Sequence, residues 1–318
     1  MTSQCSNPPF PKAAIDIGTN SVKLLIGRVT QGKLTRILKM RTQTRLGRSL
    51  IKEGIINEDG LIKSIRTLKQ FQQLIEDYNA DSIIAVGTSA LRDAGNSFEF
   101  IEAVKEQTGI DLIVISGDKE AELTVKGVLW YQDSPPTPAF ITDIGGGSTE
   151  WTIHGGNLDG NRSSIQIGAV RLFEQYIFTD PPSHHELLNM INHIIESVKQ
   201  SFLTTGIISG LGVDTIKSFV VSGGTAVTVA MLEMGLDIYD SDKIHLHKVT
   251  YAKLNELYKQ LSSMSLYDRA DVKGLEPERA DIIIPGIAIL LVLMEMLNID
   301  TLTVSDYGLL EGLLCDII

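Results

Sequence analysis

The fold of this chain is set by the stretch Phe140-Ile-Thr-Asp-Ile-Gly-Gly-Gly-Ser-Thr-Glu-Trp-Thr-Ile153. Two β-prone runs flank a turn that carries a carboxylate, three glycines and two hydroxyls, at Asp143, Gly145, Gly146, Gly147, Ser148 and Thr149. This pattern predicts a β-hairpin with a glycine turn. Because glycine has no Cβ atom, the N–H groups of such a turn can approach an anion, and the hydroxyls add donors. The carboxylate suits Mg²⁺, which proteins hold through one or two carboxylates and substrate phosphates. Taken alone, the stretch also fits an ordinary glycine-rich hairpin.

A second copy of the pattern lies near the N-terminus, in Ala13-Ala-Ile-Asp-Ile-Gly-Thr-Asn-Ser-Val-Lys-Leu-Leu-Ile26. Four residue types recur at a constant offset of 127 positions, from Asp16, Ile17, Gly18 and Ser21 to Asp143, Ile144, Gly145 and Ser148. An internal match at about the spacing of a domain predicts two related lobes that face each other. Two such hairpins would clamp phosphate across a cleft, with metal-binding carboxylates on both sides. The second turn contributes Gly18, Thr19, Asn20 and Ser21.

A third glycine turn, Gly223-Gly224, follows an apolar run that begins at Phe219. Together the three turns resemble the superfamily of acetate kinase, the sugar kinases, the heat-shock ATPases and actin, which has two phosphate hairpins and a later glycine turn. We therefore count Gly223 and Gly224 among the candidate phosphate-binding residues.

Length and composition predict a globular protein of two domains. The chain has 318 residues, of which 43% are hydrophobic and 21% charged, and its net charge is −11. Nonspecific attraction to nucleic acid or to a membrane surface is therefore not expected. Cys5 and Cys315 form no metal-ligand spacing, and we predict a cytoplasmic protein without disulfides. The longest apolar run, 287–297, is too short to span a bilayer and predicts a buried helix.

Strand-like and helical patterns alternate along the chain, which predicts an α/β fold. Strands are expected at 13–17, 22–29, 34–41, 82–87, 112–116, 140–144, 149–153, 163–167, 219–222 and 302–305. Helices are expected at 61–78, 97–108, 117–131, 184–203, 250–261 and 287–297, with one more between Gly224 and Met234 and a final one after Gly312. The polar, proline-bearing composition of residues 1–12 predicts a flexible arm. A proline-rich break at 132–138 is the expected boundary between domain I, residues 13–132 with about 303–318, and domain II, residues 133–302.

Three charged residues at strand ends and helix starts are further candidates. Arg92 follows the strand at 82–87, where ligands collect in α/β sheets, although it could instead pair with Asp93. Glu120 and Glu122 lie at the start of the predicted helix at 117–131. Acidic residues are common in a first turn because they complement the helix dipole, so residue types alone do not rank these two.

Six motifs occur in one order and resemble the exopolyphosphatase/guanosine-pentaphosphate phosphohydrolase (Ppx/GppA) family. They are Asp16-Ile-Gly-Thr-Asn-Ser21, Gly87-Thr-Ser-Ala-Leu-Arg92, Ile115-Ser-Gly-Asp-Lys-Glu-Ala121, Asp143-Ile-Gly-Gly-Gly-Ser-Thr-Glu150, Gly168-Ala-Val-Arg171 and Arg279-Ala-Asp-Ile-Ile-Ile-Pro-Gly286. The resemblance extends from about residue 13 to 315 and is closest to the short members of the family. It implies two actin-like (ribonuclease H-like) lobes with mixed sheets flanked by helices, and an active site in the cleft between them.

The resemblance also implies roles for single residues. It places the catalytic glutamate at Glu120 with Glu150 beside it, the metal-binding aspartates at Asp143 and Asp16, and a phosphate-binding arginine at Arg92. Hydrolysis of a terminal phosphoanhydride needs neutralised phosphoryl oxygens, an in-line water and a carboxylate that orients or deprotonates it. The implied cofactor is Mg²⁺ or Mn²⁺, the implied substrate is polyphosphate, guanosine pentaphosphate (pppGpp) or both, and the implied assembly is a homodimer.

Two other functions compete with a hydrolase of the stringent response. One is a catalytically weak sensor that binds the alarmone and passes the signal to a partner; the presence of both glutamates argues against it. The other is a superfamily kinase or chaperone ATPase that binds ATP at the third glycine turn.

Some positions depart from the family pattern or remain open. Lys119 stands where relatives often carry an acidic residue, and it could lower the pKa of the neighbouring base or bind phosphate. Leu310 replaces an arginine that is common in the family. A long substrate would need a basic groove, for which the candidates are Arg45, Arg48, Arg171, Lys199 and Arg269.

Overall fold

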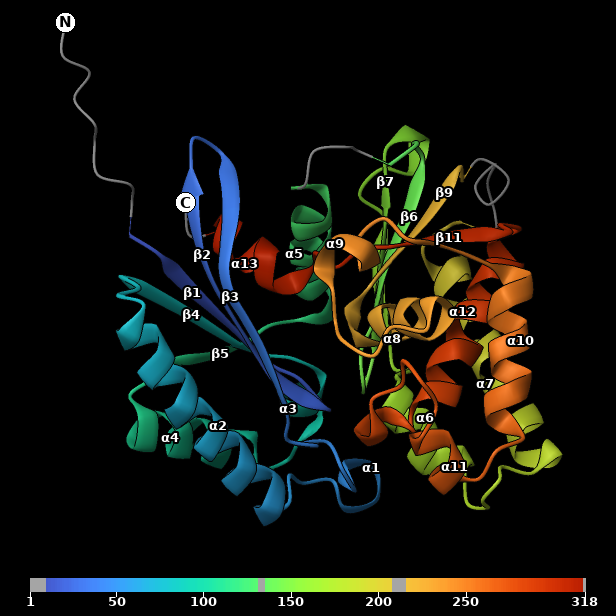
Figure 1. Ribbon diagram of the computed structural model, residues 1–318, viewed down its shortest axis with the longest axis horizontal. Coiled ribbons are helices and arrows are strands. Elements are labelled where there is room, and N and C mark those ends of the chain that lie inside the picture. Colours follow the sequence, from blue (N-terminus) through green and yellow to red (C-terminus); the bar gives the residue numbers. More distant parts are fainter. Residues whose placement is uncertain (1–9, 131–134, 208–215, 317–318) are drawn as a thin grey trace, which may run out of the picture.

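The computed structural model describes residues 10–130, 135–207 and 216–316, and it has two mixed β-sheets flanked by helices (Figure 1). Most of the predicted arm, part of the predicted break at 132–138, and Cys5 lie outside the described residues. The predicted α/β class is confirmed.

The first sheet has the strand order β3-β2-β1-β4-β5. Its strands are β1 (Lys12–Ile17), β2 (Ser21–Thr30), β3 (Lys33–Gln43), β4 (Ser82–Gly87) and β5 (Leu112–Val114). Side chains alternate between the two faces of a strand. Ile15 and Ile17 therefore pack on one face with α2 (Glu58–Asp77) and α4 (Ser97–Thr108). Ala14 packs on the opposite face, which by the same alternation is the face of Asp16.

The second sheet has the strand order β10-β11-β9-β6-β7-β8. Its strands are β6 (Ala139–Ile144), β7 (Thr149–His154), β8 (Arg162–Ile165), β9 (Ser218–Ser222), β10 (Lys248–Thr250) and β11 (Thr301–Val304). Helices α6 (Ala169–Tyr176), α7 (His184–Thr204), α8 (Gly223–Met234), α10 (Tyr251–Ser262) and α12 (Ile283–Leu297) belong to this half of the molecule (Figure 1). The described residues also form short helices at α1 (Leu50–Glu53), α3 (Ser89–Asp93), α9 (Ser241–Ile244) and α11 (Leu266–Ala270).

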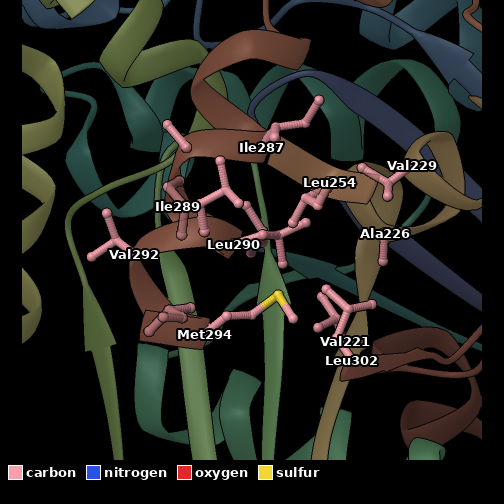
Figure 2. Close-up of a cluster of buried hydrophobic side chains, with 14 of the residues drawn as sticks. Val221, Ala226, Val229, Leu254, Ile287, Ile289, Leu290, Val292, Met294 and Leu302 are labelled. Carbon is pink, nitrogen blue, oxygen red and sulfur yellow. The ribbon is translucent and has the colours of Figure 1, made fainter. Parts of the chain in front are cut away.

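Helix α12 lies in the core of the second half, as its apolar sequence predicts. Figure 2 shows Ile287, Leu290 and Met294 of this helix among side chains from β9, α8, α10 and β11. Its apolar side chains are buried in one continuous cluster. Among the residues that the structure describes, no helix has the length and apolar character needed to cross a membrane.

Two helices, α5 (Gly117–Leu129) and α13 (Leu309–Asp316), lie between the two sheets (Figure 1). Leu123 of α5 packs with α13 on the first sheet, whereas Val128 of α5 packs on the second. The two helices touch through glycines: a Cβ atom added to Gly312 would lie 1.9 Å from the backbone oxygen of Leu123. Because Ala139 and Ile141 also face this middle layer, the alternation of β6 turns Asp143 toward it as well.

The predicted strands and helices are found, with small differences at their ends. Asn57 caps α2 as expected, accepting a 2.8 Å hydrogen bond from the Gly60 amide. No local pattern predicts the three-residue strand β10, whose partner β11 is distant in sequence. Helix α6 was not predicted either, because its N-cap, Gly168, has no side chain that signals a helix start, and its first turn contains Val170, a poor helix former.

Candidate active site

The two sequence repeats form the same turn. The Gly18 amide donates to the Ser21 carbonyl at 3.0 Å, and the Gly145 amide donates to the Ser148 carbonyl at 3.0 Å. The hairpins touch each other across the two halves of the molecule. A Cβ atom on Gly147 would lie 2.8 Å from the Thr19 hydroxyl oxygen and 2.4 Å from that of Ser89. The absence of a side chain at Gly147 thus allows its close approach to Thr19 and Ser89.

The carbonyl groups of the glycine turn are held by the protein, but two of its amides are not. The amides of Ala169 and Val170, at the start of α6, donate to the carbonyls of Gly145 and Gly146 at 3.0 and 2.8 Å. The Nε atom of Arg171 donates to the Gly147 carbonyl at 2.7 Å. In the described part of the chain, several turn amides donate to no protein oxygen, among them those of Thr19, Asn20, Gly146 and Gly147. An anion between the hairpins would satisfy these donors.

A cavity of about 60 Å³ lies between the hairpins. Most predicted site residues line it, namely Asp16, Gly18, Thr19, Asn20, Ser21, Glu120, Asp143, Gly145, Gly146, Gly147, Ser148 and Gly224. Thr149 does not line it, because its hydroxyl donates to the Ile167 carbonyl at 2.6 Å inside the second half. Arg92 and Glu150 lie next to the lining residues Glu120 and Ser148.

A row of polar side chains crosses four strands of the second sheet. Strand register places Ser222 opposite Asp143, Asp143 opposite Glu150, and Glu150 opposite Ser164. Residues directly opposite each other point to the same face of a sheet. The row therefore faces the middle layer that contains α5 and Glu120.

Arg92 connects the two predicted glutamates. Its Nη1 atom lies 2.6 Å from Oε2 of Glu120, and its Nη2 atom lies 3.4 Å from Oε1 of Glu150. Ser148 donates to the same Glu150 oxygen at 2.7 Å, and Ser164 donates to it at 2.6 Å. Ser164 has no counterpart in the sequence motifs; only strand register brings it to the site.

Both glutamates bind protons more readily than exposed carboxylates do. Burial, and then the charge of Glu150, raise the pKa of Glu120 well above its ordinary value, against the opposing effect of Arg92. Burial raises the pKa of Glu150 to about 7, although hydrogen bonds from Ser164 and Ser148 act in the other direction. A carboxyl group poised near neutral pH can accept and release a proton during a reaction.

Asp16 and Asp143 fit the requirements of a divalent cation. Asp16 is 3% exposed, and its Oδ1 atom is buried without a hydrogen-bond partner, whereas Oδ2 lies 2.9 Å from Nζ of Lys23. Burial raises the pKa of Asp143, and Lys23 opposes that shift. Gly223, with φ of 92°, leaves room for Asp143, since a Cβ atom there would lie 2.2 Å from Oδ1. No three His, Cys, Asp or Glu side chains cluster for a metal in the described residues, so substrate phosphates would supply further ligands.

Arg279 is a functional candidate to which sequence reasoning assigned no role. It lines the cavity and is 5% exposed, and its guanidinium makes no hydrogen bond or ion pair with the residues that the structure describes. Burial, and then Arg41, lower the pKa of Arg279 to about 10. A buried cation without a partner is costly, which indicates an anionic ligand. Its position in the motif Arg279–Gly286 was the available signal.

A larger cavity of about 270 Å³ adjoins the first. The two share Asp16, Lys23, Arg41, Asp143, Gly224 and Leu309. Gly223, predicted to bind phosphate, lines this larger cavity. Its basic side chains are Lys23, Lys39 and Arg41, none of which was among the predicted groove residues.

The structure gives most of the predicted basic groove residues other partners. Arg269 is buried and donates to the carbonyls of Leu261, Met264 and Ala280. Arg171 pairs with Asp93 and Lys199 with Glu196. Arg45 pairs with Asp281 at 2.9 Å. Arg48 and Arg45 line a separate cavity of about 60 Å³.

The structure also shows the surroundings of Lys119 and Leu310, the two residues that depart from the family pattern. Lys119 pairs with Glu122 and Asp316, at 3.2 and 3.3 Å, and makes no ion pair with Glu120. Leu310 is buried with Ala14 and Leu123 in the cluster between the first sheet and α13, and it also lines the larger cavity.

Comparisons with known proteins agree with this arrangement. The chain is 30% identical to Exopolyphosphatase 2 of Mycobacterium tuberculosis, over 95% of this chain and 96% of that protein. It is also 30% identical to the guanosine-5'-triphosphate,3'-diphosphate pyrophosphatase of Vibrio atlanticus, over 98% of this chain and 60% of that protein. The curated relatives differ in length, and this chain spans only 46% of another one.

A solved structure of the Aquifex aeolicus Ppx/GppA enzyme is 31% identical and superposes with a TM-score of 0.79, covering 96% of this chain and 99% of that one. The expected fold of two actin-like lobes, with mixed sheets flanked by helices, is confirmed. The sequence matches the Ppx/GppA phosphatase family over residues 25–318. This chain therefore belongs to the Ppx/GppA phosphatase family.

Proposed function

We propose that this chain hydrolyses the terminal phosphoanhydride of inorganic polyphosphate, of guanosine pentaphosphate or of both, and releases orthophosphate. The observation that carries the proposal is the contact between two glycine hairpins whose unpaired amides share one cavity with Glu120. The names of the mycobacterial and Vibrio relatives support the two substrates.

In this proposal the hairpins hold the terminal phosphate. The amides of Thr19, Asn20, Gly146 and Gly147 donate to its oxygens, as preorganised donors do for developing charge. Arg279 supplies the positive charge that its unpaired guanidinium offers. The Gly223-Gly224 turn and Lys23 contact the phosphates that follow along the larger cavity.

Glu120 orients a water molecule for in-line attack and accepts its proton. Arg92 steadies Glu120 through their ion pair, and Glu150 shares the charge of Arg92 on the other side. The protonation states of the two glutamates are linked, because each is buried and each interacts with Arg92.

The donor set also supports a divalent cation, Mg²⁺ or Mn²⁺. Asp143 and Asp16 would hold the ion, through the unpartnered Oδ1 of Asp16 among other atoms. When bound, the ion would neutralise charge on the phosphoryl oxygens. Lys23 already balances part of the charge of the two aspartates, and their carboxylates raise the pKa of Lys23 despite its burial.

The wider setting is part of the same proposal. We infer a cytoplasmic homodimer with a role in the stringent response, and no nucleic-acid or membrane partner; the net charge of −11 supports the last point. We also propose domain I as residues 13–132 with about 303–318, and domain II as residues 133–302. The burial of α13 against the first sheet supports this division.

The test is phosphate release with Mg²⁺ from long-chain polyphosphate and from guanosine pentaphosphate, side by side. We expect turnover by the wild type, and a loss of about 100- to 10,000-fold in kcat for Glu120→Gln. Glu122→Gln is the matched control, because Glu122 lies on the same helix but pairs with Lys126 at 2.8 Å. If only guanosine pentaphosphate is cleaved, the hydrolase function stands and polyphosphate is excluded as its substrate. Tight binding of either compound without release would refute the hydrolase and favour the sensor.

A further inference from the structure

Ser164 is a polar side chain that contacts a predicted site residue, Glu150, although no sequence motif contains it. It lies opposite Glu150 in the ladder between β7 and β8, so both side chains leave the same face of the sheet. Its hydroxyl donates to Oε1 of Glu150 at 2.6 Å. This distance is typical of a strong hydrogen bond from a hydroxyl to a carboxylate.

The two oxygens of Glu150 have different surroundings. Oε1 receives Ser164, Ser148 at 2.7 Å and, more distantly, Arg92 at 3.4 Å. Oε2 accepts no hydrogen bond from any residue that the structure describes. The two serines therefore fix the rotation of the carboxylate and leave Oε2 as the oxygen without a protein donor.

Ser164 also touches the helix that carries Glu120. A Cβ atom on Gly117, the first residue of α5, would lie 2.2 Å from Cβ and 2.5 Å from Oγ of Ser164. The start of α5 thus rests directly on this serine. Glu120 follows within the first turn, so Ser164 sets the spacing between the elements that carry the two glutamates.

We propose that Ser164 is a positioning residue for the hydrolysis: it holds Glu150 through Oε1, directs Oε2 to the reaction, and seats the start of α5 beside it. This inference rests on the proposed function. It differs from a purely structural role, in which the hydroxyl would satisfy a buried carboxylate and nothing more.

A double-mutant cycle separates the two roles. Wild type, Ser164→Ala, Glu150→Gln and the double variant are compared by phosphate release and by chemical unfolding. Ser163→Ala is the matched control: Ser163 is the neighbouring serine of the same strand, lies opposite Trp151 on the other face of the sheet, and makes no side-chain hydrogen bond with the described residues.

We expect Ser164→Ala to lower kcat about tenfold and to leave KM nearly unchanged, while Ser163→Ala keeps the wild-type rate. In the Glu150→Gln background the serine substitution should cause no further loss, because it acts through Glu150. Equal losses in both backgrounds, or a Ser164→Ala rate equal to that of Ser163→Ala, would overturn the proposal.

The proposed function fails in a different way. If the wild type releases no phosphate from either substrate, the hydrolase is refuted before any variant is compared, and the positioning role is refuted with it. If the wild type turns over and Glu150→Gln is fully active, the hydrolase stands and only the role of Ser164 is lost. The unfolding measurements show in each case whether the variants are folded.

Discussion

Arg92 and Glu120 form an ion pair in which Nη1 lies 2.6 Å from Oε2, and the same guanidinium lies 3.4 Å from Oε1 of Glu150. One arginine is therefore the shared partner of two buried carboxylates. Its removal would leave both without a counter-charge in a poorly solvated place.

We expect Arg92→Met to destabilise the protein by about 3 kcal/mol or more at pH 8. The loss should be smaller at pH 5, because protonated glutamates need no counter-charge. Urea unfolding at the two pH values measures this difference. Arg66→Met is the control, since Arg66 is exposed on α2 and has no ion pair in the described residues. An equal loss at both pH values would contradict the shared-partner account.

Glu150 gives a prediction of pH-dependent stability. Its pKa of about 7 lies above the usual value of 4.5, so the folded protein binds a proton that the unfolded chain releases in this range. The free energy of unfolding therefore falls as the pH rises from the pKa of the glutamate in the unfolded chain, 4.5, through its pKa in the folded protein, about 7. Glu150→Gln removes this titration, and its carbonyl can still accept from the two serines.

We expect the melting temperature of Glu150→Gln to exceed that of the wild type by about 2 °C or more at pH 8. The two proteins should melt together near pH 5, where the wild-type carboxyl is protonated. Thermal unfolding monitored by circular dichroism at both pH values is the measurement. A variant that is less stable than the wild type at pH 8 would show that burial does not control this group.

Two buried arginines give opposite predictions. Arg279 is 5% exposed and unpaired within the described residues, whereas Arg269 is 2% exposed and donates to three backbone carbonyls. Arg279→Met should keep or raise stability, since it removes a buried charge that Glu276 and Asp281 offset only in part, and should raise KM about tenfold or more. Arg269→Met should cost about 3 kcal/mol or more, because it leaves carbonyls unsatisfied.

Differential scanning calorimetry and steady-state phosphate release test the pair together. If Arg279→Met loses as much stability as Arg269→Met, then its guanidinium supports the fold and not a ligand.

We expect the substitution Gly147→Ala to lower the activity much more than it lowers the stability of the fold. A Cβ atom there would lie 2.4 Å from the Ser89 hydroxyl oxygen and 2.8 Å from that of Thr19, so Gly147→Ala must displace these two side chains, which belong to the opposite half of the site. We expect kcat/KM to fall at least about 100-fold, since catalytic positions tolerate little displacement. Gly32→Ala is the comparison: its φ of 75° strains alanine, but open space surrounds it far from the hairpins. It should cost about 1 kcal/mol and keep the rate.

Much of the fold could be predicted because its signals are local. Apolar periodicity and glycine turns located ten of the strands and the eight helices that were expected. The missing parts have non-local causes. Strand β10 is only three residues long and exists because it pairs with β11, more than fifty positions further on. Helix α6 forms against the carbonyls of the glycine turn, which its first amides contact.

The sequence by itself determined the two hairpins, because a repeated Asp-Ile-Gly pattern and its spacing require two similar turns. The resemblance of its motifs to the family also predicted the site carboxylates Asp16, Asp143, Glu120 and Glu150, whereas residue types alone did not rank Glu120 above Glu122. The tertiary structure alone decided which side chains surround them. Ser164 reaches Glu150 through strand register, and Arg279 lines the cavity beside the glycine turns, since contacts between distant segments depend on packing in three dimensions and leave no local pattern.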